Sequence, residues 1–201
     1  MNLSLKQYKT IDLTILFILL AAAEWLIAKA AGVWFPDEIY VLSPMTAMVC
    51  IVMMRWGACA AIHAFGGGLA LCMASGAEPR QYAVYCIGNC LALAALVLFR
   101  IFGKEKIRTS PALTLLFTVS AFAGAQLGRW IVGLMLGGSA GDIVTLFTTD
   151  SLSLVFAVVA VQLSRKLDGV YEDQLQYLKR VQQEQRRGQL SDHGDTEYGE
   201  A

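Results

Sequence analysis

Charged side chains stand inside three long apolar stretches of this sequence, at Glu24, Arg129 and Asp150. An ionised side chain in the hydrocarbon interior of a bilayer is costly, so it pairs with another group or faces a water-filled cavity. The guanidinium of an arginine suits a carboxylate partner, because two parallel N–H groups reach the two carboxylate oxygens. We therefore expect Arg129 to pair with Glu24 or Asp150, either in a ligand site or in a structural ion pair.

The composition indicates a membrane protein with a charged tail. The chain has 201 residues, 56% of them hydrophobic, and a mean hydropathy of +0.54; this apolar fraction exceeds that of average soluble domains. The net charge is zero, so no overall basic field favours nucleic acid binding. Charged residues become dense only from Arg165 onward. We expect a transmembrane domain over 1–164, a charged cytoplasmic helix over 165–187 and a disordered acidic tail over 188–201.

Six apolar runs come close to the length of a transmembrane helix, for which about 20 residues are needed. The runs are 12–32, 38–54, 57–76, 81–102, 111–137 and 143–164. The second run is the weakest because Ser43 and Pro44 interrupt it. If Arg55 lay inside one long helix, the chain would have five spans. The pattern predicts an all-α integral membrane protein with a bundle of six transmembrane helices.

The distribution of charge favours six spans and orients them. With six spans, one side of the membrane holds the basic residues Lys6, Lys9, Arg55, Arg100, Lys104, Lys106, Arg108, Arg165 and Lys166. The other side holds Asp37, Glu38, Glu78, Arg80 and Asp142. Cytoplasmic loops carry an excess of Lys and Arg. We therefore expect a multi-pass protein of the cell membrane with both termini in the cytoplasm.

Four polar side chains are expected at one depth of this bundle. Glu24, Asn89, Arg129 and Asp150 each lie about eight residues, or roughly 12 Å, from the outer ends of their helices. Polar groups that converge beside aromatic rings are typical of small-molecule sites. The candidate substrate-binding residues are Glu24, Trp25, Asn89, Arg129, Trp130, Thr149 and Asp150. Aromatic residues nearer the helix ends, Tyr85 among them, are expected in an interfacial belt.

A second pattern is the spacing of small residues on the third run. Ala60, Ala64 and Gly68 repeat every four residues, and such a face lets helix backbones approach closely. It could serve packing within the bundle or the docking of another membrane subunit.

Catalytic and metal-binding motifs are not found in the sequence. Gly66, Gly67 and Gly68 lie in the middle of a span, without the lysine that a phosphate-binding loop requires. The five cysteines lack metal-type spacing and suit small buried side chains. His63 is expected to be a hydrogen-bonded interior residue. We expect no enzymatic activity, no cofactor and no metal site.

The charged segment after Arg165 is expected to continue the last span as an amphipathic helix. Its imperfect apolar stripe consists of Leu167, Val170, Tyr171, Leu175, Leu178 and Val181. Basic residues such as Lys179 and Arg180 could rest on anionic lipid.

Six short helices, cytoplasmic ends and a polar layer beneath the outer face resemble an S component. S components are the substrate-capturing membrane subunits of energy-coupling factor (ECF) transporters, which take up vitamins and trace nutrients. The resemblance implies capture of a small water-soluble nutrient, with a transmembrane coupling subunit and two cytoplasmic ATPases as partners. The family docks through an Ala-x-x-x-Ala pattern in its first helix. Here Leu13 to Leu20 lacks small residues, and the docking face would instead be Ala60, Ala64 and Gly68.

Two other functions remain open. A structural or assembly scaffold of the membrane would have a closed, dry polar layer. A small proton-coupled carrier would use Glu24 or Asp150 and would transport its substrate in liposomes without ATPases.

Overall fold

A computed structural model of the chain describes residues 5–34, 42–167, 169–181 and 183. Within these ranges every regular element is a helix and no strand occurs, so the prediction of an all-α protein is confirmed. Four helical stretches are long and apolar enough to cross a membrane. A bent pair, α8 (Asp142–Thr149) and α9 (Ser151–Ser164), makes up to five.

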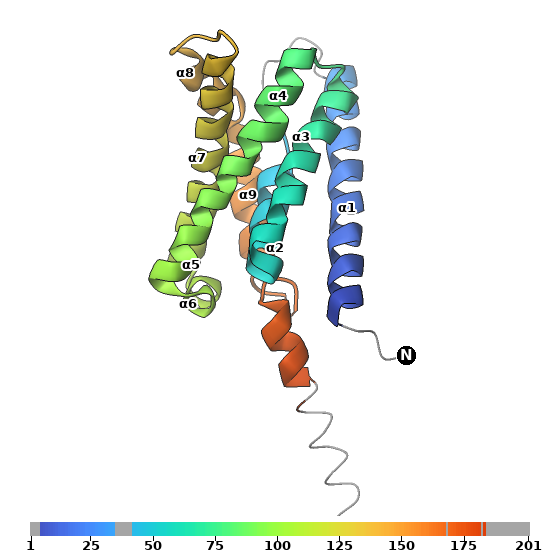
Figure 1. Cartoon of the computed structure of the whole chain (residues 1–201), viewed down its shortest axis with the longest axis vertical. Coiled ribbons are helices and arrows are strands. Elements are labelled where there is room, and N and C mark those ends of the chain that lie inside the picture. Colours follow the sequence, from blue (N-terminus) through green and yellow to red (C-terminus); the bar gives the residue numbers. More distant parts are fainter. Residues whose placement is uncertain (1–4, 35–41, 168, 182, 184–201) are drawn as a thin grey trace, which may run out of the picture.

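The helices pack side by side in a bundle (Figure 1). The other elements are α1 (Leu5–Trp34), α2 (Met45–Trp56), η1 (Gly57–Ala60), α3 (Ala61–Ser75), α4 (Pro79–Gly88), η2 (Asn89–Leu96), α5 (Val97–Phe102), α6 (Lys104–Thr109) and α7 (Pro111–Met135). We call the end that carries α6 and residues 174–181 the lower end, as drawn in Figure 1. The end that carries the starts of α4 and α8 is the upper end. α1 begins at the lower end (Figure 1).

The stretch Met45–Ser75 is a helical hairpin, although its composition alone would allow one span. In a straight helix, Met45 and Gly67 would lie roughly 33 Å apart at 1.5 Å per residue. Instead, a Cβ added to Gly67 would lie 2.7 Å from Cγ of Met45. The chain reverses at Gly57, whose φ of 62° and ψ of −128° end α2. The second predicted run is therefore shorter than expected: α2 starts at Met45, and residues 35–41 lie outside the described part of the chain.

Glycines bring α7 into backbone contact with α4 and η2. A Cβ added to Gly128 would lie 2.0 Å from the carbonyl oxygen of Gly88, and one added to Gly124 would lie 2.7 Å from that of Leu91. No side chain fits between backbones at this distance. The position after Gly128 is Arg129, so this contact brings the arginine close to α4.

The predicted sixth span, 143–164, consists of two helices in the structure. α8 and α9 meet at Asp150 with a bend of 46°. Asp150 has φ −98° and ψ 10° and lies in neither helix. Its carboxylate therefore projects from the bend.

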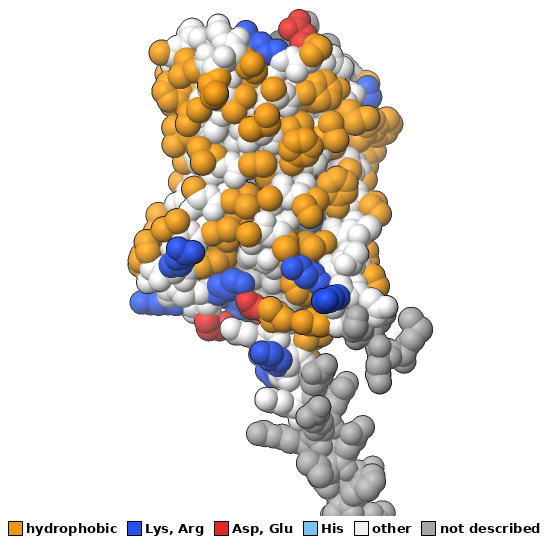
Figure 2. Space-filling model, in the orientation of Figure 1, with side chains coloured by type: hydrophobic (Ala, Val, Ile, Leu, Met, Phe, Trp, Pro, Cys, Tyr) orange, Lys and Arg blue, Asp and Glu red, His pale blue; other side chains and the backbone are white. Residues whose placement is uncertain are grey.

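The face of the bundle shown in Figure 2 is apolar across its middle, and its charged side chains gather towards the two ends. Exposed residues of α1, including Ile15, Ile18 and Leu26, point away from the core. The buried core includes Val49, Met53 and Phe117, and the ring of Phe99 stacks on that of Phe117. An apolar outer band around a packed core suits a lipid environment.

The segment after α9 differs from the predicted continuous helix. α9 ends at Ser164, and Gly169, with φ 74°, turns the chain before helix resumes at Gln174. Glycine adopts this left-handed conformation without the strain that a side chain would cause. The turn buries Tyr171 against the lower end of the bundle. The predicted disordered tail, 188–201, lies outside the described residues.

Candidate functional site

The predicted polar layer exists as a buried network, and Asp150 is the residue that pairs with Arg129. Nη1 of Arg129 lies 2.6 Å from Oδ2 of Asp150. The side chains are 2% and 5% exposed, so water screens this ion pair little. Gln126 donates to the same Oδ2 at 2.5 Å, and the Ser153 hydroxyl donates to Oδ1. The carboxylate at the bend is thus surrounded by donors from α7 and α9.

The guanidinium of Arg129 is held from a second side by α4 and η2. Its Nε donates to Oδ1 of Asn89 at 2.6 Å, and Asn89 in turn donates to the carbonyl of Ala64 at 3.3 Å. The ring of Tyr85 lies 4.7 Å from the guanidinium carbon, at cation–π distance. Nη2 makes no hydrogen bond to the described residues. One nitrogen of the guanidinium therefore remains for another acceptor.

Glu24 belongs to the same layer but is not a partner of Arg129. Its Oε1 accepts from the Ser43 hydroxyl at 2.5 Å and from the Met45 amide at 3.1 Å. The amide of Ser43 donates to the Ser153 hydroxyl at 2.8 Å. Because Ser153 also contacts Asp150, two serines connect the two carboxyl groups.

A cavity of about 370 Å³ lies at the upper end between α4, α7 and α8. Its charged and aromatic lining consists of Glu78, Arg80, Tyr85, Arg129, Trp130 and Asp142. Arg129 is only 2% exposed, so no more than an edge of its guanidinium reaches the cavity. The volume falls in the range of small-molecule pockets, roughly 300–1,000 Å³.

The cavity mouth has side chains of both charges, and contacts with the backbone hold them in place. The Glu78 carboxylate caps the start of α4, and Asp142 accepts from the amide of Ser139 at 2.9 Å. Arg80 donates to the carbonyl of Gly133 on α7 at 3.3 Å. Cation and anion positions therefore lie around one opening. Such a site suits a small polar molecule that carries a ring for Tyr85 or Trp130 to contact.

The structure brings together four of the seven predicted site residues around this cavity. Arg129 and Trp130 line it, while Asn89 and Asp150 lie behind the guanidinium. Glu24 contacts Ser43 instead. Trp25 is 53% exposed on the outside of the bundle, so it takes no part in the network. Thr149 donates to the carbonyl of Thr145 within α8 and is not among the lining residues.

Sequence reasoning missed several lining residues because it judged them by depth alone. Tyr85 was expected in an interfacial belt, and Glu78, Arg80 and Asp142 were expected only as loop charges. A helical period would have identified Tyr85, since it precedes Asn89 by four residues and so shares its face. No comparable sequence pattern indicates that Asp142 lines the cavity, because its place there depends on how α8 packs against α7.

The small-residue stripe is used within the bundle and is not available for docking. Ala60 and Ala64 are 0% exposed. A Cβ added to Gly68 would lie 2.7 Å from the backbone of Tyr85. The stripe lets α3 approach α4, which corrects the expectation that Ala60, Ala64 and Gly68 form a partner surface.

A second polar network, not foreseen from the sequence, closes the lower end. Arg55 forms a bidentate pair with Asp12, with Nη2 to Oδ1 at 2.6 Å and Nε to Oδ2 at 3.0 Å. Trp56 donates to the same carboxylate at 2.5 Å. Nη1 of Arg55 donates to the carbonyls of Gly169 and Val170. Arg55 therefore holds the turn after α9 against α1 and α2.

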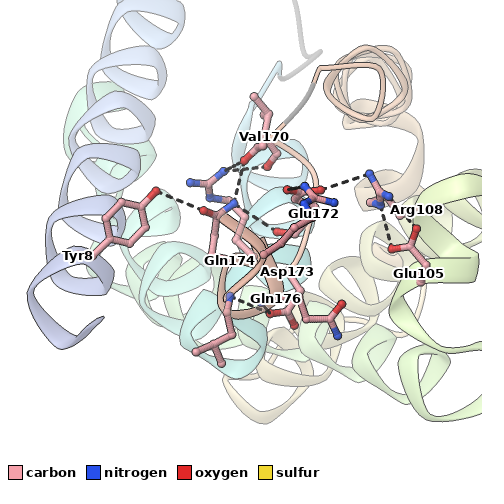
Figure 3. A network of polar contacts seen from close by, with 12 residues as sticks. Tyr8, Glu105, Arg108, Val170, Glu172, Asp173, Gln174 and Gln176 are labelled. Carbon is pink, nitrogen blue, oxygen red and sulfur yellow. Dashed lines mark hydrogen bonds and ion pairs between the residues drawn. The ribbon is translucent and has the colours of Figure 1, made fainter. Parts of the chain in front are cut away.

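Ion pairs extend this network across to α6 (Figure 3). Lys104 pairs with Asp173 at 2.5 Å, and Arg108 pairs with Glu172 at 3.4 Å. Arg108 also hydrogen-bonds Glu105, and this contact holds the pKa of Glu105 below its usual value. On the opposite side, the Tyr8 hydroxyl donates to Gln174 at 3.3 Å. The segment after α9 thus bridges α1 and α6.

Among the described residues, no three His, Cys, Asp or Glu side chains are close enough together to hold a metal ion. The imidazole of His63 approaches the carbonyl of Leu13 at 3.2 Å inside the bundle.

Comparison of this chain with protein-family models, with curated proteins and with solved structures finds no match.

Proposed function

We propose that this protein captures a small water-soluble nutrient in the upper cavity, as the S component of an ECF-type uptake transporter. The observation that carries the proposal is the cavity itself, because it joins a buried arginine to a charged, aromatic-lined opening. A guanidinium with one nitrogen that has no partner among the described residues offers donors to a carboxylate or carbonyl of the ligand. Arg80, Glu78 and Asp142 then select a ligand that carries polar groups at its other end.

In this proposal the chain crosses the membrane six times, with the lower end in the cytoplasm. The hairpin at Gly57 supports two crossings by Met45–Ser75. The bent pair α8–α9 supplies the last crossing. Basic residues Lys104, Arg108 and Arg165 meet at the lower end, which suits the cytoplasmic side. The cavity then opens to the outside, where the nutrient is found.

The proposed partners are a transmembrane coupling subunit and two cytoplasmic ATPases. The small-residue stripe of Ala60, Ala64 and Gly68 cannot contact these partners because it is buried in the bundle. The coupling subunit must therefore contact a lipid-facing surface of the bundle or its lower end. Affinity purification from the native host, followed by identification of the captured proteins, tests this part of the proposal. We expect the coupling subunit and ATPases together, and recovery of neither argues against an ECF transporter.

Nutrient capture is tested with the purified protein in detergent. Mass spectrometry of small molecules released on denaturation identifies a co-purified ligand. The melting temperature is then measured with that ligand, or with a panel of vitamins, for wild type and for Arg80→Ala. A ligand stabilises the folded state in proportion to its occupancy, so the shift should shrink in Arg80→Ala. Arg100→Ala, on the exposed face of α5 at the other end of the bundle, serves as the matched control.

The deep burial of the Arg129–Asp150 pair favours a second candidate, a structural membrane scaffold. A buried ion pair can order a helix bundle without binding anything. The scaffold predicts no co-purified molecule and no thermal shift with any member of the panel. A ligand whose shift is equal in wild type and Arg80→Ala would place its site elsewhere.

A further inference from the structure

The carboxyl group of Glu24 lies inside the bundle with one oxygen unpartnered. The residue is 0% exposed. Oε1 accepts two hydrogen bonds, from Ser43 and from the amide of Met45. Oε2 has no hydrogen-bond partner among the described residues. No described Lys or Arg forms an ion pair with either oxygen.

The charged groups around Glu24 are already compensated. Arg129 and Asp150 lie in the same polar layer and neutralise each other. The only charged residue of α2 is Arg55, and it is paired with Asp12 at the lower end. The remaining elements packed against this level, α3 and α9, contain no Lys, Arg, Asp or Glu. In the part of the chain that the structure describes, no cation is left to balance an ionised Glu24.

His63, the one titratable imidazole on α3, is too far along the bundle to help. It contacts the carbonyl of Leu13, which precedes Glu24 by eleven positions, or roughly 16 Å along a helix. Lys29 lies on the same helix as Glu24 but is exposed at the surface. A buried carboxylate without a cation is far more costly than a neutral carboxyl that leaves a single O–H group without an acceptor.

We infer that Glu24 is a proton-binding site of the bundle and carries its proton in the folded protein. The proton makes Glu24 a neutral hydrogen-bond acceptor for the start of α2. Loss of the proton would place a second anion in the layer, where it would compete with Asp150 for Arg129. Ser43 and Ser153 connect the two carboxyl groups by hydrogen bonds. They do not form a proton wire, because the connection passes through the backbone amide of Ser43.

Infrared spectroscopy of the full-length protein in detergent tests this assignment directly. A protonated carboxyl group has a carbonyl stretch that a carboxylate lacks. We expect the wild-type spectrum near neutral pH to contain such a band, and the spectrum of Glu24→Gln to have lost it. A difference spectrum that shows only the loss of carboxylate bands would overturn the inference. Glu78→Gln, at the cavity mouth, is the control and should remove carboxylate bands.

Stability gives a second readout that does not depend on ligand binding. Glutamine retains the Oε1 acceptor of a neutral glutamate and needs no proton, so Glu24→Gln should melt no lower than wild type near neutral pH. Asp150→Asn removes a charge that Arg129 needs and should melt well below both. As the pH rises, wild type should lose stability relative to Glu24→Gln, because the unfolded chain releases the proton that the folded protein holds. Equal loss of stability in Glu24→Gln and Asp150→Asn would show that Glu24 is ionised.

Discussion

Arg129 of α7 is bound to Asp150 at the bend between α8 and α9, with 2.6 Å between Nη1 and Oδ2. The residues are 21 positions apart. Asp150 lies between α8 and α9, and its carboxylate points into the bundle at the bend. The ion pair therefore joins α7 to the bend and presents the guanidinium to the cavity from behind.

Removal of one member of this pair should be far more destabilising than removal of both. Asp150→Ala leaves a buried guanidinium without its anion, and we expect a loss of about 3–5 kcal/mol in the free energy of unfolding. The double variant Arg129→Met/Asp150→Leu fills similar volume without charge and should lose much less. Unfolding of the detergent-solubilised protein by denaturant measures both. If the double variant is no more stable than Asp150→Ala, the pair is not the origin of the loss.

The glycine contact between α7 and α4 should tolerate no side chain. Gly128→Ala places a Cβ 2.0 Å from the carbonyl oxygen of Gly88, and the backbones must separate. Overpacking of this kind costs about 1–3 kcal/mol. Gly133→Ala, on the same helix with nothing within 4 Å of its added Cβ, is the matched control and should change little. Similar melting temperatures for the two variants would contradict the observed approach.

Arg55 should hold the segment after α9 against the bundle. Arg55→Ala removes the donors to the carbonyls of Gly169 and Val170 and leaves Asp12 without its cation. We expect faster hydrogen–deuterium exchange over residues 169–181, with exchange in α7 unchanged. Arg55→Lys should give an intermediate result, since lysine cannot reproduce the bidentate contact. Arg100→Ala serves as the control, and exchange as slow as in wild type in Arg55→Ala would refute the role of Arg55.

Tyr171 should be more stable as phenylalanine. Its hydroxyl is buried without a partner among the described residues, so Tyr171→Phe removes a desolvated polar group and should gain up to about 1 kcal/mol. Burial raises the pKa of Tyr171 well above its usual value. The folded protein therefore retains this proton above the pH at which the unfolded chain releases it, and stability falls as the pH rises beyond about 10. Denaturant unfolding as a function of pH should show this fall in wild type and less of it in Tyr171→Phe.

The proposed orientation can be checked by cysteine labelling in a background without the five native cysteines. Glu78→Cys at the upper end should react with a membrane-impermeant maleimide in intact cells. Lys106→Cys at the lower end should react only after permeabilisation. Reaction of both from the outside would eliminate the arrangement with the lower end in the cytoplasm.

The sequence by itself determined the helical class. In a membrane the backbone N–H and C=O groups of a long apolar run have no water to bind, and a helix pairs them within the run. It also determined that Arg129 needs a carboxylate, since an unpaired guanidinium in an apolar run is too costly. Both conclusions follow from the types of neighbouring residues. They require no knowledge of which helices touch.

Only the tertiary structure decided between Glu24 and Asp150 as the partner of Arg129. The two lie at similar depths, so the choice depends on helix rotation and on the bend at Asp150, which apolar periodicity does not specify. The tertiary structure also decided the partner of Arg55. Its ion pair with Asp12 depends on the packing of α2 against α1. The sequence of the small-residue stripe on α3 is compatible with contact to a partner protein and with contact to a neighbouring helix. In the structure the backbone of α4 packs against it. Contacts between helices follow from shape and rotation, and these arise only when the whole bundle is assembled.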